Sequence, residues 1–444
     1  MGGWDELSLT GSHLLDIYRR MVIPPLKQHA TPSIGFEDLR KEAVLAVLFV
    51  AQTFFQKIGL RVKYRGLEQV RGRRLVFMAN HQGGNLDALV LASILYVERE
   101  QVPLIPTSDR LLEAKFVGQF NQYLKYIGPF FIRSSFKEDQ TYIDEVSHFL
   151  EQVLDAKQSL LFFPEGYTSK HGKPCPFRRG MLKSLLRGGA VTFCPVSITY
   201  ESPLNDVGVK TETFSPLAVF NGVMARRVGT VYVNFGECID ADDTTDHKVL
   251  STRIGNAICR EIPILTVDLI ATVLLDSGTI TIEQLSRKVQ WLEGHVRNHR
   301  LPYISKDVRK AMLAIQHLIS RSEQEVTVKD GVALTFYRNR LLPLFFELAC
   351  PSPLLRNECV WSVAHLHPDA RLQELAVRVM SPLIGVYSTI LTSLAGGVKS
   401  VATLKNLVDS SPATSCYTLR NLLQLLEEQK KITVRGDTIL ITGE

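Results

Sequence analysis

The sequence predicts an α/β protein with a central mixed sheet flanked by helices, a helical N-terminal segment, and a mainly α C-terminal region that ends in a winged-helix-like unit. Three observations predict this fold. Short buried-strand patterns alternate with helical patterns between about residues 60 and 245, helical patterns dominate outside that range, and two helical segments precede a hairpin pattern near the C-terminus. We therefore expect three parts, residues 1–60, 61–245 and 246–444, with the winged-helix-like unit at about 400–444.

In the middle part, strand and helix patterns follow one another in order. Arg74–Ala79 is a short apolar run that ends at Asn80-His81 and a Gly83-Gly84 turn, as expected for a buried strand. Apolar residues recur at helical spacing in Tyr142–Lys157, which predicts an amphipathic helix. The other elements expected here are a helix over Asp87–Val97 and strands over Ser159–Phe163, Cys194–Tyr200 and Thr230–Phe235.

After Asp246 the strand patterns fade and helical patterns dominate. At the end of the chain, two apolar runs flank Arg435-Gly436-Asp437, which is typical of a hairpin. Two helices before that hairpin resemble a winged helix, but no concentrated basic recognition helix accompanies them, so nucleic-acid binding is not expected. The expected helices are Val249–Arg260, Ile282–Val296, Lys306–Ile319, Val401–Val408 and Thr418–Glu428, and the hairpin strands are Lys431–Val434 and Thr438–Ile441.

The composition is that of a folded globular protein. Of the 444 residues, 45% are hydrophobic and 22% are charged, which argues against disorder and against a dense disulfide scaffold. The seven cysteines are scattered without a CxxC pair, so we expect reduced thiols and no structural zinc site. The net charge of +6 is small, but Arg61–Arg74 and Lys170–Tyr200 each carry six basic residues. These two basic stretches could face phosphate groups, or they are solvated faces.

Two apolar runs bear on membrane contact. Ala43–Phe55 is too short to span a bilayer comfortably. Val379–Val398 has no formal charge but is diluted by proline, glycine, serine and threonine. We expect a buried core helix for this second run, with membrane contact and a true span as the second and third interpretations.

One stretch of the chain carries residues suited to acid–base chemistry and phosphate binding. A histidine at a strand end, as at His81, can act as a general base if a carboxylate holds its other ring nitrogen. Asp87 is the nearest carboxylate after it, and Gly83-Gly84 could let the chain fold back so that the two meet. The alternative is a strand-end histidine that is only hydrogen-bonded. The basic residues that could hold a phosphate are Arg133, Lys170, Lys173, Arg178 and Arg179.

Four short blocks occur in a fixed order along this stretch. They contain Asn80, His81 and Asp87 in the first, Gly128, Phe131, Ile132 and Arg133 in the second, Phe163, Glu165, Gly166, Ser169, Gly172 and Lys173 in the third, and the run from Pro195 to Ile198 in the fourth. Their order and spacing resemble the motifs of the glycerolipid acyltransferases, and within them the glycerol-3-phosphate and dihydroxyacetone-phosphate acyltransferase branch. The helical tail around Leu334–Asn339 is also similar to the C-terminal region of the glycerol-3-phosphate branch.

The resemblance implies an O-acyltransferase with residues 61–245 as its catalytic domain. Such an enzyme transfers a fatty acyl group from a thioester donor, acyl-CoA or acyl-carrier protein, to the hydroxyl of glycerol 3-phosphate or dihydroxyacetone phosphate, the first step of glycerophospholipid synthesis. The thioester is a co-substrate, and neither another cofactor nor a metal is expected. Two alternatives stay open: acylation of lysophosphatidate or another lysophospholipid, and a catalytically inactive member of the family that binds lipid as a scaffold.

The resemblance also implies roles for single residues. His81 would take the proton from the acceptor hydroxyl, and Asp87 would fix the imidazole tautomer. Glu165 would shape its loop or contact acceptor hydroxyls, and the backbone amides of the glycine turn are candidates for stabilising the oxyanion. The residues expected to bind substrate are Gly128, Phe131, Ile132, Arg133, Glu165, Gly166, Ser169, Lys170, Lys173, Arg178, Arg179 and Pro195.

The chain departs from the family pattern at three places that matter for the site, one of which is Ser134 in the second block, where the family often has an arginine after Arg133. Five residues separate His81 from Asp87 where the family has four, so the pair can meet only if Gly83-Gly84 absorb a bulge. In the third block the family's Thr-Arg-Ser-Arg is Tyr167-Thr168-Ser169-Lys170, which removes one guanidinium and replaces the other with an ammonium. One of the two arginines that follow this block could compensate.

Because the acyl donor and the products are amphiphilic, we expect a protein at a membrane surface with its catalytic domain facing the cytosol, and the sequence does not name the membrane. The candidate contacts are the Leu45–Phe55 run, the Leu341–Phe346 run and the two basic stretches. Packing of the apolar runs into the core is the competing interpretation.

Overall fold

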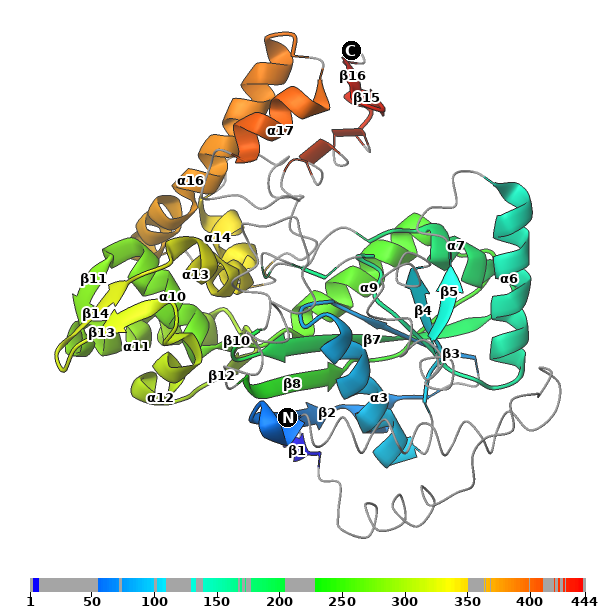
Figure 1. The fold of residues 1–444 in the computed structure, drawn as a ribbon, viewed down its shortest axis with the longest axis horizontal. Coiled ribbons are helices and arrows are strands. Elements are labelled where there is room, and N and C mark those ends of the chain that lie inside the picture. The colour runs from blue at the N-terminus through cyan, green and yellow to red at the C-terminus, as the bar shows by residue number, and fades with distance from the viewer. Residues whose placement is uncertain are drawn as a thin grey trace. The chain divides into compact units, whose positions relative to one another are not determined.

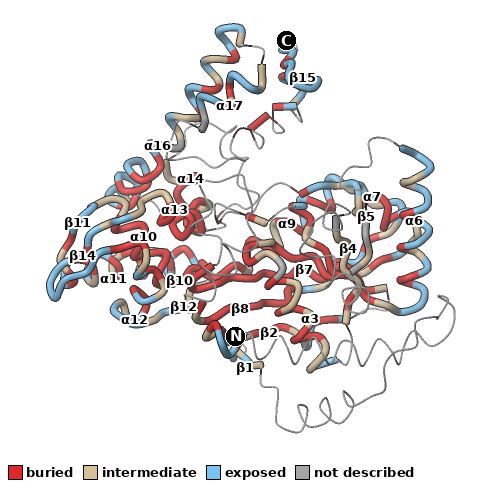
Figure 2. Tube along the Cα trace, in the orientation of Figure 1, coloured by how far each residue is buried: buried red, intermediate tan, exposed pale blue. Residues whose placement is uncertain are grey.

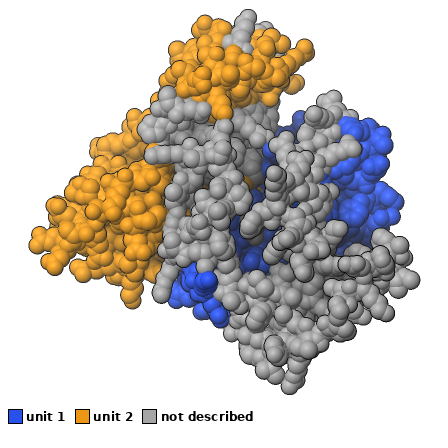
Figure 3. Space-filling view, viewed as in Figure 1, with its two compact units in different colours: residues 1–166, 178–200, 224–258 blue, residues 167–177, 201–223, 259–444 orange. Residues whose placement is uncertain are grey.

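The computed structural model divides the chain into two compact units, which are described separately. Unit 1 comprises residues 1–166, 178–200 and 224–258, and unit 2 comprises residues 167–177, 201–223 and 259–444 (Figure 3). The three sequential parts expected from the sequence stay a prediction. The residues that the structure describes are 3–7, 55–71, 74–99, 102–108, 129–132, 139–166, 168–169, 172, 177–203, 228–349, 363, 365–367, 369–398, 400–409, 419, 422–423, 426–427 and 429–441.

Unit 1 is built on a seven-stranded sheet (Figure 1). β3 runs parallel to both of its neighbours, β6 and β7, and β2 runs parallel to β8, whereas β7 and β8 are antiparallel. The central mixed sheet expected from the sequence is therefore confirmed. The strands are β1 (Asp5–Glu6), β2 (Leu60–Arg65), β8 (Gly229–Phe235), β7 (Val191–Tyr200), β3 (Leu75–Ala79) and β6 (Leu160–Phe162) in spatial order, with β9 (Ile239–Ala241) paired to β7.

The apolar sequence of the central strands explains their burial. All residues of β3 and β6 are buried, as is usual for parallel strands that are covered on both faces. Figure 2 shows β7 and β8 buried along most of their length. Helices flank the sheet as expected, and α6 buries its apolar face and packs against α7. These helices are α3 (Asn85–Arg99), α6 (Gln140–Asp155), α7 (Gly180–Arg187) and α9 (His247–Glu261).

The carboxyl ends of three strands meet at one edge of this sheet. β3, β6 and β7 run in the same direction, so the chain segments that follow β3 and β6 and the last residues of β7 come together there. A parallel bridge between Leu104 and Leu160 joins the start of β4 (Ile105–Ser108) to β6, and β4 runs parallel to β5 (Pro129–Ile132). β5 therefore ends on the same side as the other three strands.

The core of unit 2 is the helix α10. Its residues from Thr266 to Leu274 are all buried, and it packs against α11, α12, α13 and α16. Three small sheets accompany the helices, in which β10 pairs with β12, β14 lies between β11 and β13, and β15 pairs with β16. The elements are β10 (Ile264–Leu265), α10 (Thr266–Ser277), β11 (Thr279–Thr281), α11 (Ile282–Asn298), β12 (Tyr303–Ile304), α12 (Val308–Met312), β13 (Ile319–Arg321), β14 (Glu325–Val328), α13 (Gly331–Arg338), α14 (Leu342–Ala349), α16 (Ala370–Ala395), α17 (Val401–Asp409), β15 (Ile432–Arg435) and β16 (Thr438–Ile441).

Strand patterns fade after Asp246 in the sequence, but the described residues there form three small sheets between the helices. Their strands have two to four residues, too few for an alternating pattern to stand out. The helix expected over Lys306–Ile319 is limited to α12 and a 3-10 turn at Leu313–Ile315, since Ile319 already begins β13. The C-terminal hairpin is confirmed as β15–β16.

At the N-terminus, Asp5 and Glu6 form a short antiparallel strand against β2, not the expected helix. Residues 8–54, which hold most of that helical segment and of the Ala43–Phe55 run, lie outside the described residues. Phe55 itself is buried. The Leu45–Phe55 membrane contact therefore stays a prediction.

The two apolar runs of unit 2 differ in their burial. In the Leu341–Phe346 run, all residues except Pro343 are buried, so this run packs into the core. In α16, Met380, Tyr387 and Ile390 are fully buried but alternate with exposed positions, so only one face of the expected core helix is buried. No single helix among the described residues has the length and apolarity to cross a membrane, although the two halves of α16, bent by 52°, meet that criterion together.

Candidate active site

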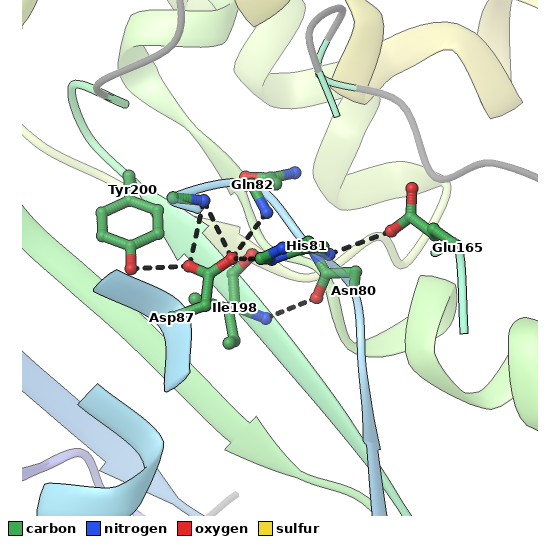
Figure 4. A network of polar contacts seen from close by, with 8 residues as sticks. Asn80, His81, Gln82, Asp87, Glu165, Ile198 and Tyr200 are labelled. Carbon is green, nitrogen blue, oxygen red and sulfur yellow. Dashed lines mark hydrogen bonds and ion pairs between the residues drawn. The ribbon is translucent and has the colours of Figure 1, made fainter. Parts of the chain in front are cut away.

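The imidazole of His81 and the carboxylate of Asp87 lie in direct contact. His81 follows β3 at the edge where the parallel strands end, and Asp87 lies in the first turn of α3. The distance from His81 Nδ1 to Asp87 Oδ2 is 2.8 Å (Figure 4). The Asp87 side chain is fully buried, whereas 16% of the His81 side chain is exposed. The contact expected from the sequence is therefore present, with the carboxylate inside and the imidazole reaching the surface.

The glycine turn between them absorbs the extra residue, as the spacing requires. Gly84 has a positive φ of 63°, a conformation that favours glycine, and its carbonyl accepts a hydrogen bond from the Asp87 amide at 3.0 Å. A Cβ on Gly83 would lie 2.6 Å from both Asp87 Oδ1 and Tyr200 Oη. Neither position has room or backbone freedom for another residue, so both glycines are structural requirements of the contact.

The Asp87 carboxylate accepts hydrogen bonds from two backbone amides and from a tyrosine hydroxyl, in addition to its contact with His81. The Gln82 amide donates to Oδ2 at 2.8 Å, the Gly83 amide donates to both oxygens at 2.9 and 3.0 Å, and the Tyr200 hydroxyl donates to Oδ1 at 2.7 Å. These donors compensate the desolvation of a buried carboxylate. Burial, together with the negative charge of Asp87, raises the pKa of Tyr200 well above its usual range, so the phenol stays protonated and keeps donating.

This arrangement corrects one expectation about the turn. The backbone amides of the Gly83-Gly84 turn were candidates for stabilising an oxyanion, but the Gly83 amide donates to Asp87, as does the preceding Gln82 amide. The Gly83 amide is therefore engaged by the Asp87 carboxylate in this structure, and the oxyanion role of the Gly84 amide stays a prediction.

His81 is fixed on two further sides. Its ring stacks on Phe163 with a centroid separation of 4.1 Å and an interplanar angle of 16°. Its backbone amide donates to Glu165 Oε1 at 2.9 Å. Because Nδ1 faces an acceptor-only carboxylate, the network assigns the neutral ring the Nδ1–H tautomer, which puts the basic lone pair on Nε2. Glu165 thus holds the backbone of His81, in keeping with the loop-shaping role expected for it.

An exposed arginine lies against the turn that carries Glu165. Gly166 adopts a φ of 71°, and a Cβ there would lie 2.6 Å from Arg178 Cδ and 2.7 Å from Arg178 Nε. The Arg178 amide also donates to the Pro164 carbonyl at 2.8 Å. The chain therefore returns to this turn after the third block and places a cation beside it. Arg179, the next residue, directly precedes α7.

Asn80 joins the first block to the fourth. Its side chain donates from Nδ2 to the Ile198 carbonyl at 2.9 Å and accepts from the Ile198 amide at 2.7 Å. These two bonds fix the end of β3 to β7. Pro195 pairs with Met78 inside β7, and its carbonyl accepts from the Gly236 amide at 2.8 Å, so the contacts described for it are those of a strand residue.

The other predicted substrate-binding residues are distributed as follows. Phe131 and Ile132 form the end of β5. Ser169 is buried in unit 2 and accepts a hydrogen bond from the Gly172 amide. Gly128, Arg133, Lys170 and Lys173 lie outside the described residues. In the described part of the chain, no group of three or more His, Cys, Asp or Glu side chains is arranged to hold a metal ion.

Sequence reasoning missed two side chains of the site. Tyr200 was expected only as the last residue of a strand, and Phe163 only as a motif match, although one holds Asp87 and the other stacks on His81. A polar aromatic residue at the carboxyl end of an otherwise apolar strand was the available signal for Tyr200.

Comparisons with known proteins agree with the four blocks and with the helical tail. The acyltransferase family model matches residues 61–199, and the model of the glycerol-3-phosphate acyltransferase C-terminal region matches residues 210–379. Among curated relatives, a glycerol-3-phosphate acyltransferase of Pseudomonas putida (strain W619) is 24% identical over 375 residues, covering 69% of this chain and 43% of the relative. Another, from Pseudomonas aeruginosa (strain UCBPP-PA14), is 30% identical over 212 residues, covering 44% of this chain and 25% of the relative.

The chain thus spans less than half the length of these curated relatives. Among solved structures, the crystal structure of the 1-acyl-sn-glycerophosphate acyltransferase from Thermotoga maritima is 19% identical with a TM-score of 0.36, covering 56% of this chain and 85% of that one.

Proposed function

We propose that the chain is a member of the glycerol-3-phosphate acyltransferase branch of the glycerolipid acyltransferases and that it transfers a fatty acyl group from a thioester to a hydroxyl of glycerol 3-phosphate. The acyltransferase match over residues 61–199, the match to the C-terminal region of the glycerol-3-phosphate enzymes over residues 210–379 and the curated relatives support this proposal. The observation that carries the proposal is the His81–Asp87 hydrogen bond, in which a buried carboxylate orients an imidazole that reaches the surface. This geometry favours a catalytic chain over an inactive scaffold, since an inactive member has no need to keep it.

In the proposed reaction His81 is the general base. Nε2 takes the proton from the acceptor hydroxyl as that oxygen attacks the thioester carbonyl, and Asp87 holds Nδ1–H and stabilises the imidazolium that forms. When the tetrahedral intermediate collapses, the carbon–sulfur bond breaks and the departing thiolate takes up a proton from His81. The thioester is already activated, so this route needs neither a covalent enzyme intermediate nor a further cofactor.

The acceptor phosphate is proposed to bind the cations of the second and third blocks. Arg178 supports this placement, because it lies on the Gly166 turn, and the adjacent Glu165 binds the backbone of His81. If these cations hold the phosphate of glycerol 3-phosphate, the hydroxyls of the same molecule would lie near the His81 imidazole. The cations assigned to this role are Arg133, Lys170, Lys173, Arg178 and Arg179.

The acyl donor, acyl-CoA or acyl-carrier protein, and a membrane surface complete the proposal. An amphiphilic donor and product favour a protein that works at a lipid surface with its catalytic domain facing the cytosol. The exposed basic side chain of Arg61 and its neighbours on β2 are one candidate contact with anionic headgroups. Flotation with anionic and with neutral liposomes tests this part, and a protein that stays at the bottom of both gradients contradicts it.

We also propose that the C-terminal end is winged-helix-like. Its helix α17 begins against the β15–β16 turn, where the Val401 amide donates to the Asp437 carbonyl at 2.8 Å and the Ala402 amide donates to Asp437 Oδ1 at 2.7 Å. A helix and a hairpin tied in this way support a small module.

The test of the proposed reaction is thiol release from acyl-CoA by the purified chain, scanned over acceptors. Glycerol 3-phosphate, dihydroxyacetone phosphate, lysophosphatidate and a lysophospholipid without a free phosphate are compared at equal concentration. We expect the highest kcat/KM with glycerol 3-phosphate. Preference for lysophosphatidate would instead support the alternative enzyme, and no thiol release with any acceptor, with acyl-carrier protein also tried as donor, would contradict the proposal.

A further inference from the structure

Two cysteines of unit 1 lie opposite each other at the side of the central sheet where β9 pairs with β7. The last pair of that antiparallel ladder is Phe193 with Ile239, so the next step of the same register places Cys194 opposite Cys238. Opposed residues of an antiparallel ladder carry their side chains on the same face of the sheet. Their Cα atoms are about 4.5–5.5 Å apart, which lies within the range of about 4.4–6.8 Å that a disulfide requires.

The contacts of the two side chains agree with this register. Both thiols are free, and they form a hydrogen bond with each other. Cys194 Sγ also lies 3.9 Å from the Gly236 carbonyl oxygen, and the Gly236 amide donates to the Pro195 carbonyl at 2.8 Å. The turn between β8 and β9, which carries Cys238, is therefore folded back against Cys194. The two sulfurs can be joined without a change in strand pairing.

The two sulfurs differ in exposure and in acidity. Cys194 is fully buried, whereas Cys238 is partly exposed. Their hydrogen bond lowers the pKa of Cys238 to about 6, and the charge of Arg71 acts in the same direction, although burial opposes both. The hydrogen bond, together with burial, raises the pKa of Cys194 well above its usual range. At neutral pH the accessible sulfur is therefore a thiolate, and the buried sulfur beside it is a thiol.

We propose that Cys238 and Cys194 are a peroxide-reactive pair that closes into a disulfide. An accessible thiolate next to a second cysteine is the arrangement in which a first sulfur is oxidised and a second one resolves it. The inference is independent of the proposed acyl transfer, because neither sulfur belongs to the hydrogen-bond network of His81 and Asp87.

The proposed oxidation has two steps. The Cys238 thiolate attacks one oxygen of hydrogen peroxide, the O–O bond breaks, and the products are the Cys238 sulfenic acid and hydroxide, which takes up a proton to become water. The Cys194 sulfur then attacks the Cys238 sulfur, the S–S bond forms, and the sulfenic S–O bond breaks. The departing hydroxide leaves as water with the proton of the Cys194 thiol. The two thiols lose two electrons and the peroxide gains them, and an added dithiol reverses the change.

The test is a map of disulfides in the full chain, purified in reduced form and treated with hydrogen peroxide at pH 7. Remaining thiols are blocked with N-ethylmaleimide at acidic pH before digestion with trypsin. The digest places each cysteine in its own peptide, residues 188–210 for Cys194 and residues 228–248 for Cys238. We expect these two peptides to be recovered joined to each other, and dithiothreitol to release them.

Single variants assign the two roles. Cys194→Ser should lose the joined peptides and accumulate sulfenic acid on Cys238, trapped by dimedone on the 228–248 peptide in larger amount than in wild type. Cys238→Ser should lose the joined peptides and show no dimedone adduct on Cys194. The matched control is Cys259→Ala, another buried cysteine, which should form the joined peptides at the wild-type rate. If Cys194→Ser does not fold, as judged by circular dichroism, Cys194→Ala takes its place.

Three results would overturn the proposal. The first is a wild type whose two peptides stay separate after peroxide treatment, whatever the oxidation state of the other cysteines. The second is a disulfide that joins Cys238 to a cysteine other than Cys194, in the same molecule or in another one. The third is a dimedone adduct on Cys194 in Cys238→Ser, which would show that the buried sulfur reacts first. The acyl-transfer assay has no part in these outcomes, so this inference and the proposed function fail separately.

Discussion

Asp87 in unit 1 and Asp268 in unit 2 are both fully buried carboxylates, but the molecule stabilises them differently. Asp87 is surrounded by neutral donors and by an imidazole that reaches the surface. Asp268 pairs with the buried guanidinium of Arg340 and accepts from the Leu265 amide at 2.8 Å. Burial raises the pKa of Asp268 to about 6, although Arg340 and the Leu265 amide act in the opposite direction.

The two pairs are suited to different roles. The His81–Asp87 pair is suited to the proposed proton transfer, and the Arg340–Asp268 pair is suited to holding the helices of unit 2 together. In the proposed reaction Nε2 of His81 accepts the proton, and Asp87 keeps its hydrogen bonds from the Gln82 and Gly83 amides and the Tyr200 hydroxyl. Asp268 and Arg340 form an ion pair with no exposed surface, and removing either member leaves an uncompensated charge in the core. Burial alone therefore does not distinguish the proposed catalytic aspartate from the structural one. The two differ in the exposure of the partner, because His81 is partly exposed and Arg340 is not.

The largest effect is expected when the His81–Asp87 pair is broken. His81→Ala should lower kcat by about 10²- to 10⁴-fold, since a general base contributes that much. Steady-state thiol release measures it, and urea unfolding should show a fold close to that of wild type. The matched control is His148→Ala on α6, whose ring is 70% exposed and which should keep wild-type activity. Activity of His81→Ala within about tenfold of wild type would defeat the mechanism.

The next largest effect is expected when the Arg340–Asp268 ion pair is broken. Arg340→Met leaves Asp268 buried without its counter-charge, so we expect a loss of about 3–5 kcal/mol in the free energy of unfolding, measured by urea denaturation. The double variant Arg340→Met with Asp268→Leu should recover most of that loss, because it buries no charge. A single variant as stable as wild type would mean that water or another group reaches Asp268.

A smaller effect is expected when Asp87 loses only the hydrogen bond from the Tyr200 hydroxyl. Tyr200→Phe removes one donor from Asp87, so we expect about 0.5–1.5 kcal/mol less stability and a decrease in kcat of less than about tenfold. The matched control is Tyr64→Phe on β2, which removes a hydroxyl that donates to Glu98 at 2.5 Å, away from Asp87. Equal effects of the two variants on kcat would show that Tyr200 has only a structural role.

The smallest effect concerns a pair of cysteines in unit 1, the buried Cys194 and the partly exposed Cys238. The hydrogen bond with Cys194, with the charge of Arg71, lowers the pKa of Cys238 to about 6, against burial. The rate of alkylation by iodoacetamide should therefore rise from pH 5 to pH 7 and level off above, whereas an ordinary thiol has its midpoint near about 8.5.

The cause of that shift can be tested directly. Cys194→Ala removes the donor and should move the alkylation midpoint of Cys238 upwards, whereas Cys194→Ser keeps a donor and should move it less. Equal midpoints in wild type and Cys194→Ala would show that Cys194 does not cause the shift.

The parts of the site that depend on local sequence could be predicted. The strand before His81, the helix that carries Asp87 and the role of Gly83-Gly84 all lie within a few residues of one another. Tyr200 and the Asn80–Ile198 bonds could not be predicted, because they depend on which strands are neighbours and in which register they pair. The same holds for the contact of Gly172 with the Phe336 carbonyl in unit 2, which joins residues far apart in the chain.

The interleaving of the two units has a consequence for the smallest piece of this protein that can be made. A shortened chain that ends at residue 245 would stop inside unit 1, which continues to residue 258, and would keep residues 167–177 and 201–223 without the unit to which they belong. Gly172 would lose the Phe336 carbonyl against which it rests. We therefore expect a fragment that ends at residue 245 to be recovered as an aggregate.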